Sequence, residues 1–237
     1  MKNLLTEKQI MLITGTRKGL GKSFVEYYSK KGFTIIGCSK KPVDYKIKNY
    51  YHFCLDVSDE KEVKEMFLFI QNKFGKLDVL INNAGIGSMN HSLLTPISTV
   101  HRILNTNLVG NFLLSRESAK IMKKNNFGRI VNLVSFAVPF KLEGEAVYAA
   151  SKAAIISLTE TLSREFADYG ITVNAVSPPA IPTDLIKGVP KEKMIVLLKR
   201  QAIHRYGKPR EVCNVIDFFI SKKNNMITGE IVFMGGI

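Results

Sequence analysis

The chain has 237 residues, 46% of them hydrophobic, and a formal net charge of +14 from 34 Lys and Arg against 20 Asp and Glu. The basic residues are dispersed and do not alternate with aromatic ones, which favours a solvated lysine-rich surface over a nucleic-acid interface. No uncharged apolar run approaches the roughly 20 residues that span a membrane, and the N-terminal residues carry no signal-peptide pattern. The three cysteines are odd in number and far apart, so they predict a cytoplasmic protein without disulfides or a metal site.

The first predicted element is an apolar strand over residues 9–14, followed by a glycine-rich turn that ends at Gly21 and a helix that continues to Tyr28. Glycines at such a turn allow a tight bend and a close approach of the backbone to a phosphate, and the helix N-terminus supplies N–H donors. A strand before the glycines and a helix after them are the context that a nucleotide-binding turn requires. We therefore expect a nucleotide here; the alternative is a glycine-rich turn without a ligand.

A second strand, residues 33–38, is followed by two lysines, Lys40 and Lys41, and by no acid at the strand end. In dinucleotide-binding folds an acidic residue at this place binds the ribose 2′-hydroxyl of NAD. Two more basic residues, Arg17 and Lys18, lie in the glycine turn. Basic residues without a carboxylate favour a 2′-phosphate, and hence NADPH; the alternative is that the lysines are only exposed surface residues.

The third predicted strand, residues 50–57, carries Asp56 at its carboxyl end, where a carboxylate can accept a hydrogen bond from an adenine amino group. We expect Ser58 to cap the helix that follows, because acids fill the first turn of that helix. A fourth strand begins at Asp78 and leads into the sequence Asn82-Asn83-Ala84-Gly85. Its two asparagines either tie strand ends together or contact the cofactor.

A long helical pattern over residues 99–124 contains three asparagines, Asn105, Asn107 and Asn111. Asparagine is unfavourable inside a helix. The pattern therefore predicts a local distortion or a functional contact, unless these side chains are simply exposed. Residues 128–135 then form the fifth predicted strand.

Tyr148 and Lys152 follow, four residues apart in a helical run that continues to about Tyr169. Positions i and i+4 share a helix face, so we expect the lysine ammonium beside the phenol hydroxyl, where it would lower the tyrosine pKa. Ser135, at the end of the fifth strand, supplies a second hydroxyl. Such a set can polarise a carbonyl group and protonate its oxygen, although a Tyr-x-x-x-Lys pair alone also occurs on many ordinary helices.

The sixth predicted strand, residues 171–177, is ended by Pro178–Pro179. Residues 183–206 are polar, and we interpret them as a lid over the site. A helix over residues 209–222 and a last strand within residues 227–237 complete the chain.

Strands that alternate with helices at this spacing indicate a parallel sheet wound on both sides. We therefore expect one α/β domain over residues 1–237. It would be a Rossmann-type doubly wound parallel sheet of about seven strands with helices on both faces.

Thr14-Gly15-x-x-x-Gly19-x-Gly21, Asn82-Asn83-Ala84-Gly85 and Tyr148-x-x-x-Lys152 occur in this order, with Asn107 and Ser135 between the last two. In order and spacing these motifs resemble the short-chain dehydrogenase/reductase family. The resemblance runs from about residue 8 to the C-terminus. Within the family the chain is most similar to the 3-oxoacyl-[acyl-carrier-protein] reductase type.

The resemblance implies a role for each matching position. Tyr148 would be the general acid, Ser135 would orient the substrate carbonyl, and Lys152 would hold the nicotinamide ribose and lower the Tyr148 pKa. Asn107 would bind a water that relays protons. The backbone of the glycine turn would hold the pyrophosphate. The residues expected to contact the cofactor are Gly15, Thr16, Arg17, Lys18, Gly19, Leu20, Gly21, Ser39, Lys40, Asp56, Val57, Asn83, Ala84, Gly85, Tyr148, Lys152, Pro178, Ile181 and Thr183.

Two stretches depart from the family pattern. Pro179 stands where the family usually has glycine, and because proline fixes φ and lacks an N–H, the loop on the nicotinamide side is expected to differ in shape. Arginines typical of acyl-carrier-protein reductases are absent around residues 125–127 and 168–169, where only Lys123 and Lys124 offer positive charge. Delivery of the substrate by a carrier protein is therefore left open.

The expected function is NADPH-dependent reduction of a ketone, either a 3-oxoacyl thioester or another small molecule, to a secondary alcohol. NADP(H) is expected to be preferred over NAD(H). One alternative is a reductase or dehydrogenase of a sugar or a secondary-metabolite intermediate, and another is a non-catalytic NADP-binding regulator. The resemblance also implies a homo-oligomer, either a tetramer or a dimer, and no nucleic-acid or membrane partner is expected.

Overall fold

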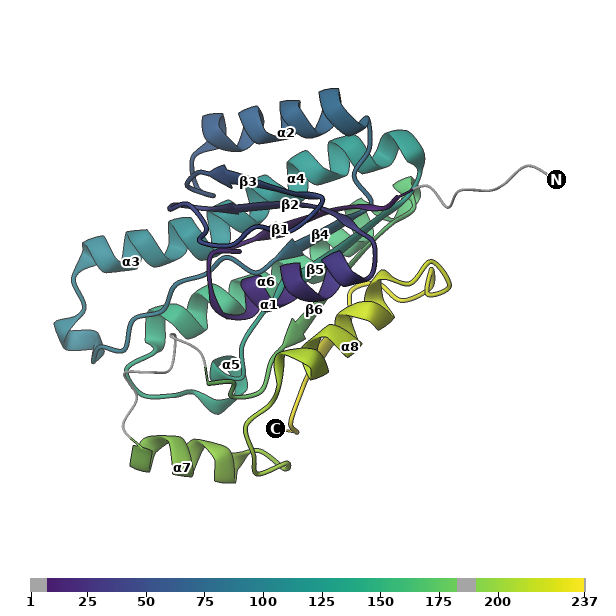
Figure 1. Cartoon of the computed structure of the whole chain (residues 1–237). Helices are drawn as coiled ribbons and strands as arrows, with labels where there is room; N and C mark the ends of the chain where they lie inside the picture. The colour runs from purple at the N-terminus through teal and green to yellow at the C-terminus, as the bar shows by residue number, and fades with distance from the viewer. Residues whose placement is uncertain (1–7, 183–190, 237) are drawn as a thin grey trace.

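The computed structural model describes residues 8–182 and 191–236. Within them, seven parallel strands form one sheet in the order β3-β2-β1-β4-β5-β6-β7 (Figure 1). This arrangement confirms the predicted doubly wound sheet. The strands are β1 (Ile10–Thr14), β2 (Thr34–Ser39), β3 (Tyr50–Cys54), β4 (Val79–Asn82), β5 (Gly128–Leu133), β6 (Ile171–Ser177) and β7 (Ile231–Phe233).

Helices cover both faces of the sheet (Figure 1). On one face α1 (Gly19–Lys30) and α8 (Pro209–Ile220) pack against the central strands. On the other face lie α2 (Glu60–Phe74), α4 (Gly110–Met122) and α6 (Ala146–Glu165). Because both faces are covered, the central strands are mostly apolar, and β1 and β5 are buried at every position.

The strand order reverses between β1 and β4. The strands that follow β1 in the sequence, β2 and β3, lie on one side of it, whereas β5, β6 and β7 lie on the opposite side, beyond β4. In open parallel sheets, ligands bind outside the carboxyl ends of the strands at such a reversal. The turn after β1, the turn after β4 and the end of β5 therefore meet at one edge, where the sequence placed its glycine turn, Gly85 and Ser135.

The predicted long helix over residues 99–124 is interrupted. It consists of α3 (Ile97–Leu104), a π-helical segment at Asn105–Val109, α4, and a 3₁₀ turn at Lys123–Asn125. The predicted distortion at the asparagines is therefore confirmed, and Asn107 and Asn111 are buried, not exposed. The sequence prediction was wrong at the start of α2, since Asp59 caps this helix by accepting hydrogen bonds from Lys61 N and Glu62 N.

Part of the predicted lid is a regular helix, α7 (Lys191–Arg200). Its buried Met194 and Leu197 pack against Phe140 of the short helix α5 (Ala137–Phe140) and against Ala180. The remainder of the predicted lid, residues 183–190 with Thr183, lies outside the described residues.

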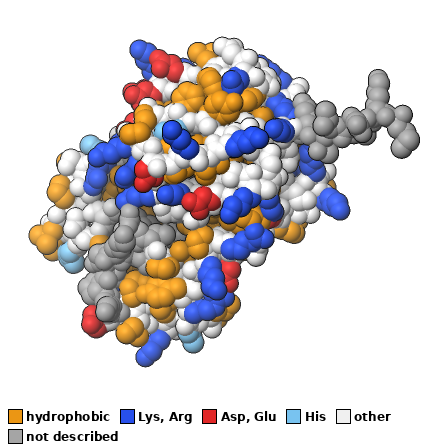
Figure 2. Space-filling view, in the orientation of Figure 1, with side chains coloured by type: hydrophobic (Ala, Val, Ile, Leu, Met, Phe, Trp, Pro, Cys, Tyr) orange, Lys and Arg blue, Asp and Glu red, His pale blue; other side chains and the backbone are white. Residues whose placement is uncertain are grey.

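The distribution of charge on the surface and the character of the helices both agree with the composition. Lys and Arg are spread over the visible face of the molecule without forming one block, as the sequence predicted (Figure 2). Across the described segments, none of the helices combines the length and apolar character needed to cross a membrane.

Candidate active site

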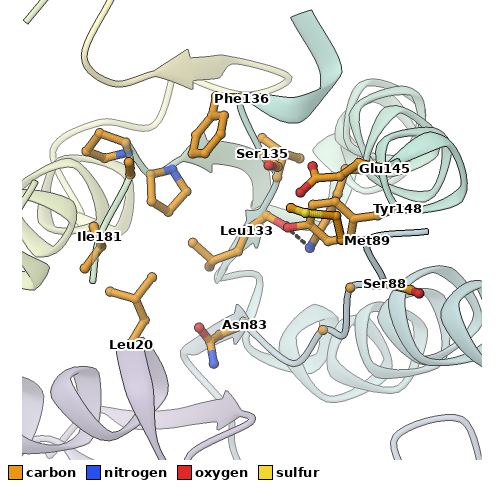
Figure 3. A pocket seen from close by; sticks show the side chains of 17 residues that line it. Leu20, Asn83, Ser88, Met89, Leu133, Ser135, Phe136, Glu145, Tyr148 and Ile181 are labelled. Carbon is orange, nitrogen blue, oxygen red and sulfur yellow. Dashed lines mark hydrogen bonds between the residues drawn. The ribbon is translucent and has the colours of Figure 1, made fainter. Parts of the chain in front are cut away.

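A cavity of about 230 Å³ opens at the carboxyl edge of the sheet (Figure 3). It is formed by the start of α1, the segment after β4, the end of β5, the N-terminal turn of α6 and the segment after β6. Nine of the residues singled out from the sequence line it together, namely Leu20, Asn83, Gly85, Ser135, Tyr148, Lys152, Pro178, Pro179 and Ile181.

Three polar side chains meet under this cavity. Ser135, Tyr148 and Lys152 are all buried, with exposed fractions of 7%, 8% and 5%. The Lys152 ammonium donates a hydrogen bond to the Leu133 carbonyl (2.7 Å) and lies 5.9 Å from the centre of the Tyr148 ring. The Ser135 hydroxyl accepts from Ala137 N (3.1 Å) and lies near enough to the Tyr148 phenol to affect its pKa. The spacing on α6 therefore places the phenol and the ammonium on one face, as predicted.

Burial is the main cause of the pKa shifts of Tyr148 and Lys152. Desolvation raises the pKa of Tyr148 to about 12, against the opposing effect of the Ser135 hydroxyl. Desolvation also lowers the pKa of Lys152 to about 8. The Tyr148 pKa is thus raised where the sequence led us to expect a lowered value, because burial of the phenol is the largest influence and Lys152 is not among the groups that shift this pKa. At neutral pH the phenol keeps its proton, which suits an acid.

Asn107 lies beneath the same group on the π-helical segment. Its amide donates to the Ile86 carbonyl (3.0 Å) and to Ser151 Oγ (2.9 Å), and its Oδ1 accepts from Ile86 N (2.9 Å). A Cβ atom on Gly85 would lie 3.4 Å from both Asn107 Oδ1 and Lys152 Nζ. The π-helical turn thus brings an asparagine next to the lysine, and Gly85 lies against both of them.

The glycine turn has the geometry expected of a phosphate site. Gly15 and Gly19 adopt φ values of +70° and +59°, in the left-handed region that favours glycine. Asn83 ties this turn to β4, since its amide donates to the carbonyls of Thr14 (2.7 Å) and Gly15 (3.3 Å). Of the two alternatives for Asn83, the structure supports the tie between strand ends. A glycine turn that leads into the N-terminus of α1 fits the pyrophosphate of a nicotinamide dinucleotide.

The residues predicted to contact the adenosine part of the cofactor lie at the edge next to β2. Lys40 forms an ion pair with Asp56 (2.5 Å). Burial pushes the pKa of Asp56 upward, but the hydrogen bonds from Lys40 and Ser58 outweigh it and hold that pKa below its usual value. Val57 is buried against Gly110. The structure therefore brings Lys40 and Asp56 together as partners of one another, which the sequence alone did not indicate.

Behind Ser39 lies a polar network that the sequence reasoning missed. Tyr50 Oη lies 2.8 Å from Thr16 Oγ1 and 2.7 Å from His52 Nδ1, and His52 Nε2 lies 3.1 Å from Ser39 Oγ. Gly37 makes room for it, because a Cβ there would overlap the Tyr50 ring. The alternation of Tyr50 and His52 on β3 was the available signal, since such residues share one face of a strand. The network links the glycine turn to the end of β2.

The departure at Pro179 also has a structural counterpart. A Cβ atom on Gly207 would overlap the Pro179 ring, and Gly207 N donates to the Ala180 carbonyl (2.9 Å). The proline is thus accommodated by a glycine that lies distant in sequence. Pro178 and Ile181 still line the cavity on either side of it.

Glu145 is a further site residue that the sequence reasoning passed over. It lines the cavity just before α6, and burial raises the pKa of its carboxyl group. A second cavity of about 530 Å³ adjoins the first, because Met89, Phe136 and Glu145 line both. Its other walls come from the segment after α5 and from α7.

Comparison with known proteins agrees with this geometry. A family model described as short chain dehydrogenase matches residues 9–194. The 3-oxoacyl-[acyl-carrier-protein] reductases FabG of Vibrio cholerae serotype O1 and Thermotoga maritima are each 33% identical to the chain, with 97% of both partners covered. The chain therefore belongs to the short-chain dehydrogenase/reductase family, as its motifs indicated. It is an oxidoreductase that acts on CH–OH groups with a nicotinamide cofactor.

Solved structures give the same result. The chain superposes on a structure titled "ElxO with NADP Bound" with a TM-score of 0.88 and 31% identity, covering 96% of this chain and 97% of that one. It superposes on "4-hydroxyisoleucine dehydrogenase complexed with NADH" with a TM-score of 0.87 and 28% identity, covering 97% and 98%. Relatives of similar likeness thus carry either nicotinamide dinucleotide.

Proposed function

We propose that this protein is an NADPH-dependent ketoreductase in which Tyr148 is the general acid. The observation that carries the proposal is the buried set of Ser135, Tyr148 and Lys152 beneath one cavity. A protonated phenol that lines the same cavity as a serine hydroxyl is suited to donate a proton to a carbonyl oxygen. The bound cofactor would supply the hydride for the carbonyl carbon.

Each residue of this set has a separate task in the proposal. Ser135 holds the carbonyl oxygen by a hydrogen bond, and Tyr148 gives that oxygen its proton, so that the ketone becomes a secondary alcohol. Lys152, kept in place by the Leu133 carbonyl, stabilises the phenolate that forms as the proton leaves. Asn107 fixes the backbone at Ile86 and lies beside Lys152, where it supports the return of a proton to the site.

We propose NADP(H) over NAD(H) from the charges at the β2 edge. Arg17, Lys18 and Lys40 are exposed there, and the carboxylate nearby, Asp56, is already paired with Lys40. Fluorescence titration of the purified protein with NADPH and NADH at fixed salt tests this. NADPH should bind at least tenfold more tightly, and equal or tighter NADH binding would refute the preference.

For the substrate we propose a 3-oxoacyl thioester. The FabG relatives are named as 3-oxoacyl-[acyl-carrier-protein] reductases. The second cavity suits an acyl thioester, because it combines apolar Leu142, Met194 and Leu197 with basic Lys141 and Arg200. Steady-state rates with acetoacetyl thioesters against simple ketones test the assignment, and faster turnover of simple ketones would contradict it.

Two other functions are tested by the same assays. A sugar or metabolite dehydrogenase is favoured by the structural neighbour titled as a putative gluconate dehydrogenase; it would oxidise alcohols faster than it reduces ketones. A non-catalytic regulator would bind NADPH but reduce nothing. We also propose a homo-oligomer, because Val109 at the end of the π-helical segment and Phe112 of α4 both expose apolar surface. Light scattering of the purified protein measures its mass.

A further inference from the structure

Glu145 lies where the two cavities meet. It immediately precedes α6, three residues before Tyr148, and it lines both the first cavity and the second. Figure 3 shows its carboxylate directed into the cavity, on the side where Ser135 and Tyr148 lie. The carboxylate is close enough to Tyr148 to affect its charge, because it contributes to the raised pKa of that phenol.

The Glu145 carboxylate has no hydrogen-bond donor or cation bound to it among the residues that the structure describes. The other acids with little exposure are paired: Asp78 accepts from Ile10 N (2.7 Å), and Glu117 binds Lys120 (2.8 Å). Arg200, a basic residue of the second cavity, donates instead to the Phe140 carbonyl (2.8 Å). Glu145 is therefore the exception among them.

An unpaired, partly buried carboxylate is costly, because it loses hydration and gains no partner in exchange. Such a group calls for an explanation by a ligand or by catalysis. The cost is recovered when a molecule in the cavity donates a hydrogen bond to it. The same group then penalises a molecule that fills the cavity without a donor.

We propose that Glu145 is a specificity-determining residue that accepts a hydrogen bond from a hydroxyl or N–H group of the substrate close to the carbonyl that is reduced. This inference rests on the proposed ketone reduction. The donor has two possible sources. It is either a group on the carbon next to the ketone, or an amide N–H in the arm of an acyl thioester, which would run from the first cavity into the second.

The test compares two matched pairs of substrates. The first pair is 2-butanone and 1-hydroxy-2-butanone. The second pair is the ethyl and the N-acetylcysteamine thioesters of acetoacetate, of which only the latter carries an amide N–H. For each pair the preference is the ratio of kcat/KM with the donor to kcat/KM without it, measured at saturating NADPH.

In the wild-type protein we expect a preference of at least tenfold for the donor in one pair, and that pair identifies the source. Glu145→Met, which keeps the length of the side chain and removes the acceptor, should bring the ratio close to one. Glu145→Gln, which keeps an acceptor oxygen, should retain part of the preference. Glu165→Met is the matched control, because Glu165 is exposed at the far end of α6, lines neither cavity and should leave the ratio unchanged.

Several results would overturn the inference. One is a wild-type ratio near one in both pairs, and another is an equal loss of kcat/KM for all four substrates in Glu145→Met, which indicates a purely structural role. NADPH titration and a thermal melt of each variant show that it is folded. If the wild-type protein reduces none of the ketones, the proposed function fails. Calorimetric binding of the donor-bearing compounds to the wild-type and Glu145→Met proteins then decides the inference by itself: equal affinity, or no binding to either, overturns it.

Discussion

The proposed reaction end of the site and its proposed adenosine end are built in different ways. At the reaction end, Tyr148 and Lys152 are buried, and their pKa values are set by desolvation. At the adenosine end, Arg17, Lys18 and Lys40 stand in solvent. Burial suits the first region to the proposed proton transfer, because the environment of a buried group shifts its pKa strongly. Exposure limits the second region to charge recognition, which solvent and salt weaken.

The largest loss of activity is expected from a substitution at Tyr148. Tyr148→Phe removes the proposed proton donor and preserves the ring, so the reduction rate should fall by about 10²–10⁴-fold. NADPH affinity should change little, because the charged contacts lie at the other end. The measurement is kcat together with a fluorescence titration of NADPH. Turnover within a few-fold of wild type would remove Tyr148 from the mechanism.

The dependence of kcat/KM on pH tests whether the charge of the buried Lys152 supports reduction. Lys152, with its pKa lowered to about 8, loses its charge as the pH rises through that value, whereas Tyr148, with a pKa raised to about 12, keeps its proton. If the ammonium supports proton transfer, kcat/KM for reduction should fall above pH 8, by up to tenfold per pH unit. The profile is measured from pH 6 to 10. A flat profile over this range would show that the Lys152 charge is not needed.

At the exposed end we expect a smaller effect that depends on salt. Lys40→Met should weaken NADPH binding by about three- to tenfold at low salt and less at high salt, and leave NADH binding nearly unchanged. Lys48→Met, an exposed lysine elsewhere before β3, is a matched control. An equal loss of affinity for NADPH and NADH would show that Lys40 does not bind the 2′-phosphate.

The smallest effect is expected in the network behind Ser39. His52→Leu breaks the contacts to Tyr50 and Ser39 and should lower NADPH affinity by about two- to threefold. The rate at saturating NADPH should stay unchanged, because the buried end is not touched. The outcome is read from paired Kd and kcat values, and a loss of kcat with an intact Kd would contradict it.

The sequence predicted the sheet well because its signals are local. Residues 9–14 contain an unbroken apolar run from Ile10 to Ile13, which is typical of a strand buried on both faces. The glycine turn and the pair of Tyr148 and Lys152 were predictable for the same reason, since their geometry follows from spacing along one turn or one helix.

Contacts between distant segments could not be read in this way. The pairing of Lys40 with Asp56 depends on how the ends of β2 and β3 meet. The raised Tyr148 pKa depends on how completely the surrounding segments cover the phenol. Glu145 gave no signal, because an acid before a helix usually stabilises the helix N-terminus. A role for Glu145 in substrate binding can be inferred only once the structure shows that its carboxylate has no partner among the described residues.

The contact between Pro179 and Gly207 constrains how this chain can change. The Pro179 ring occupies the space that any side chain at position 207 would need. The two positions therefore form a linked pair, and a substitution at Gly207 is tolerated only if the proline is replaced first. During directed evolution of this protein, single changes at position 207 should be rejected, whereas double variants with glycine at 179 should be recovered, so the order in which mutations arise decides which variants can be reached.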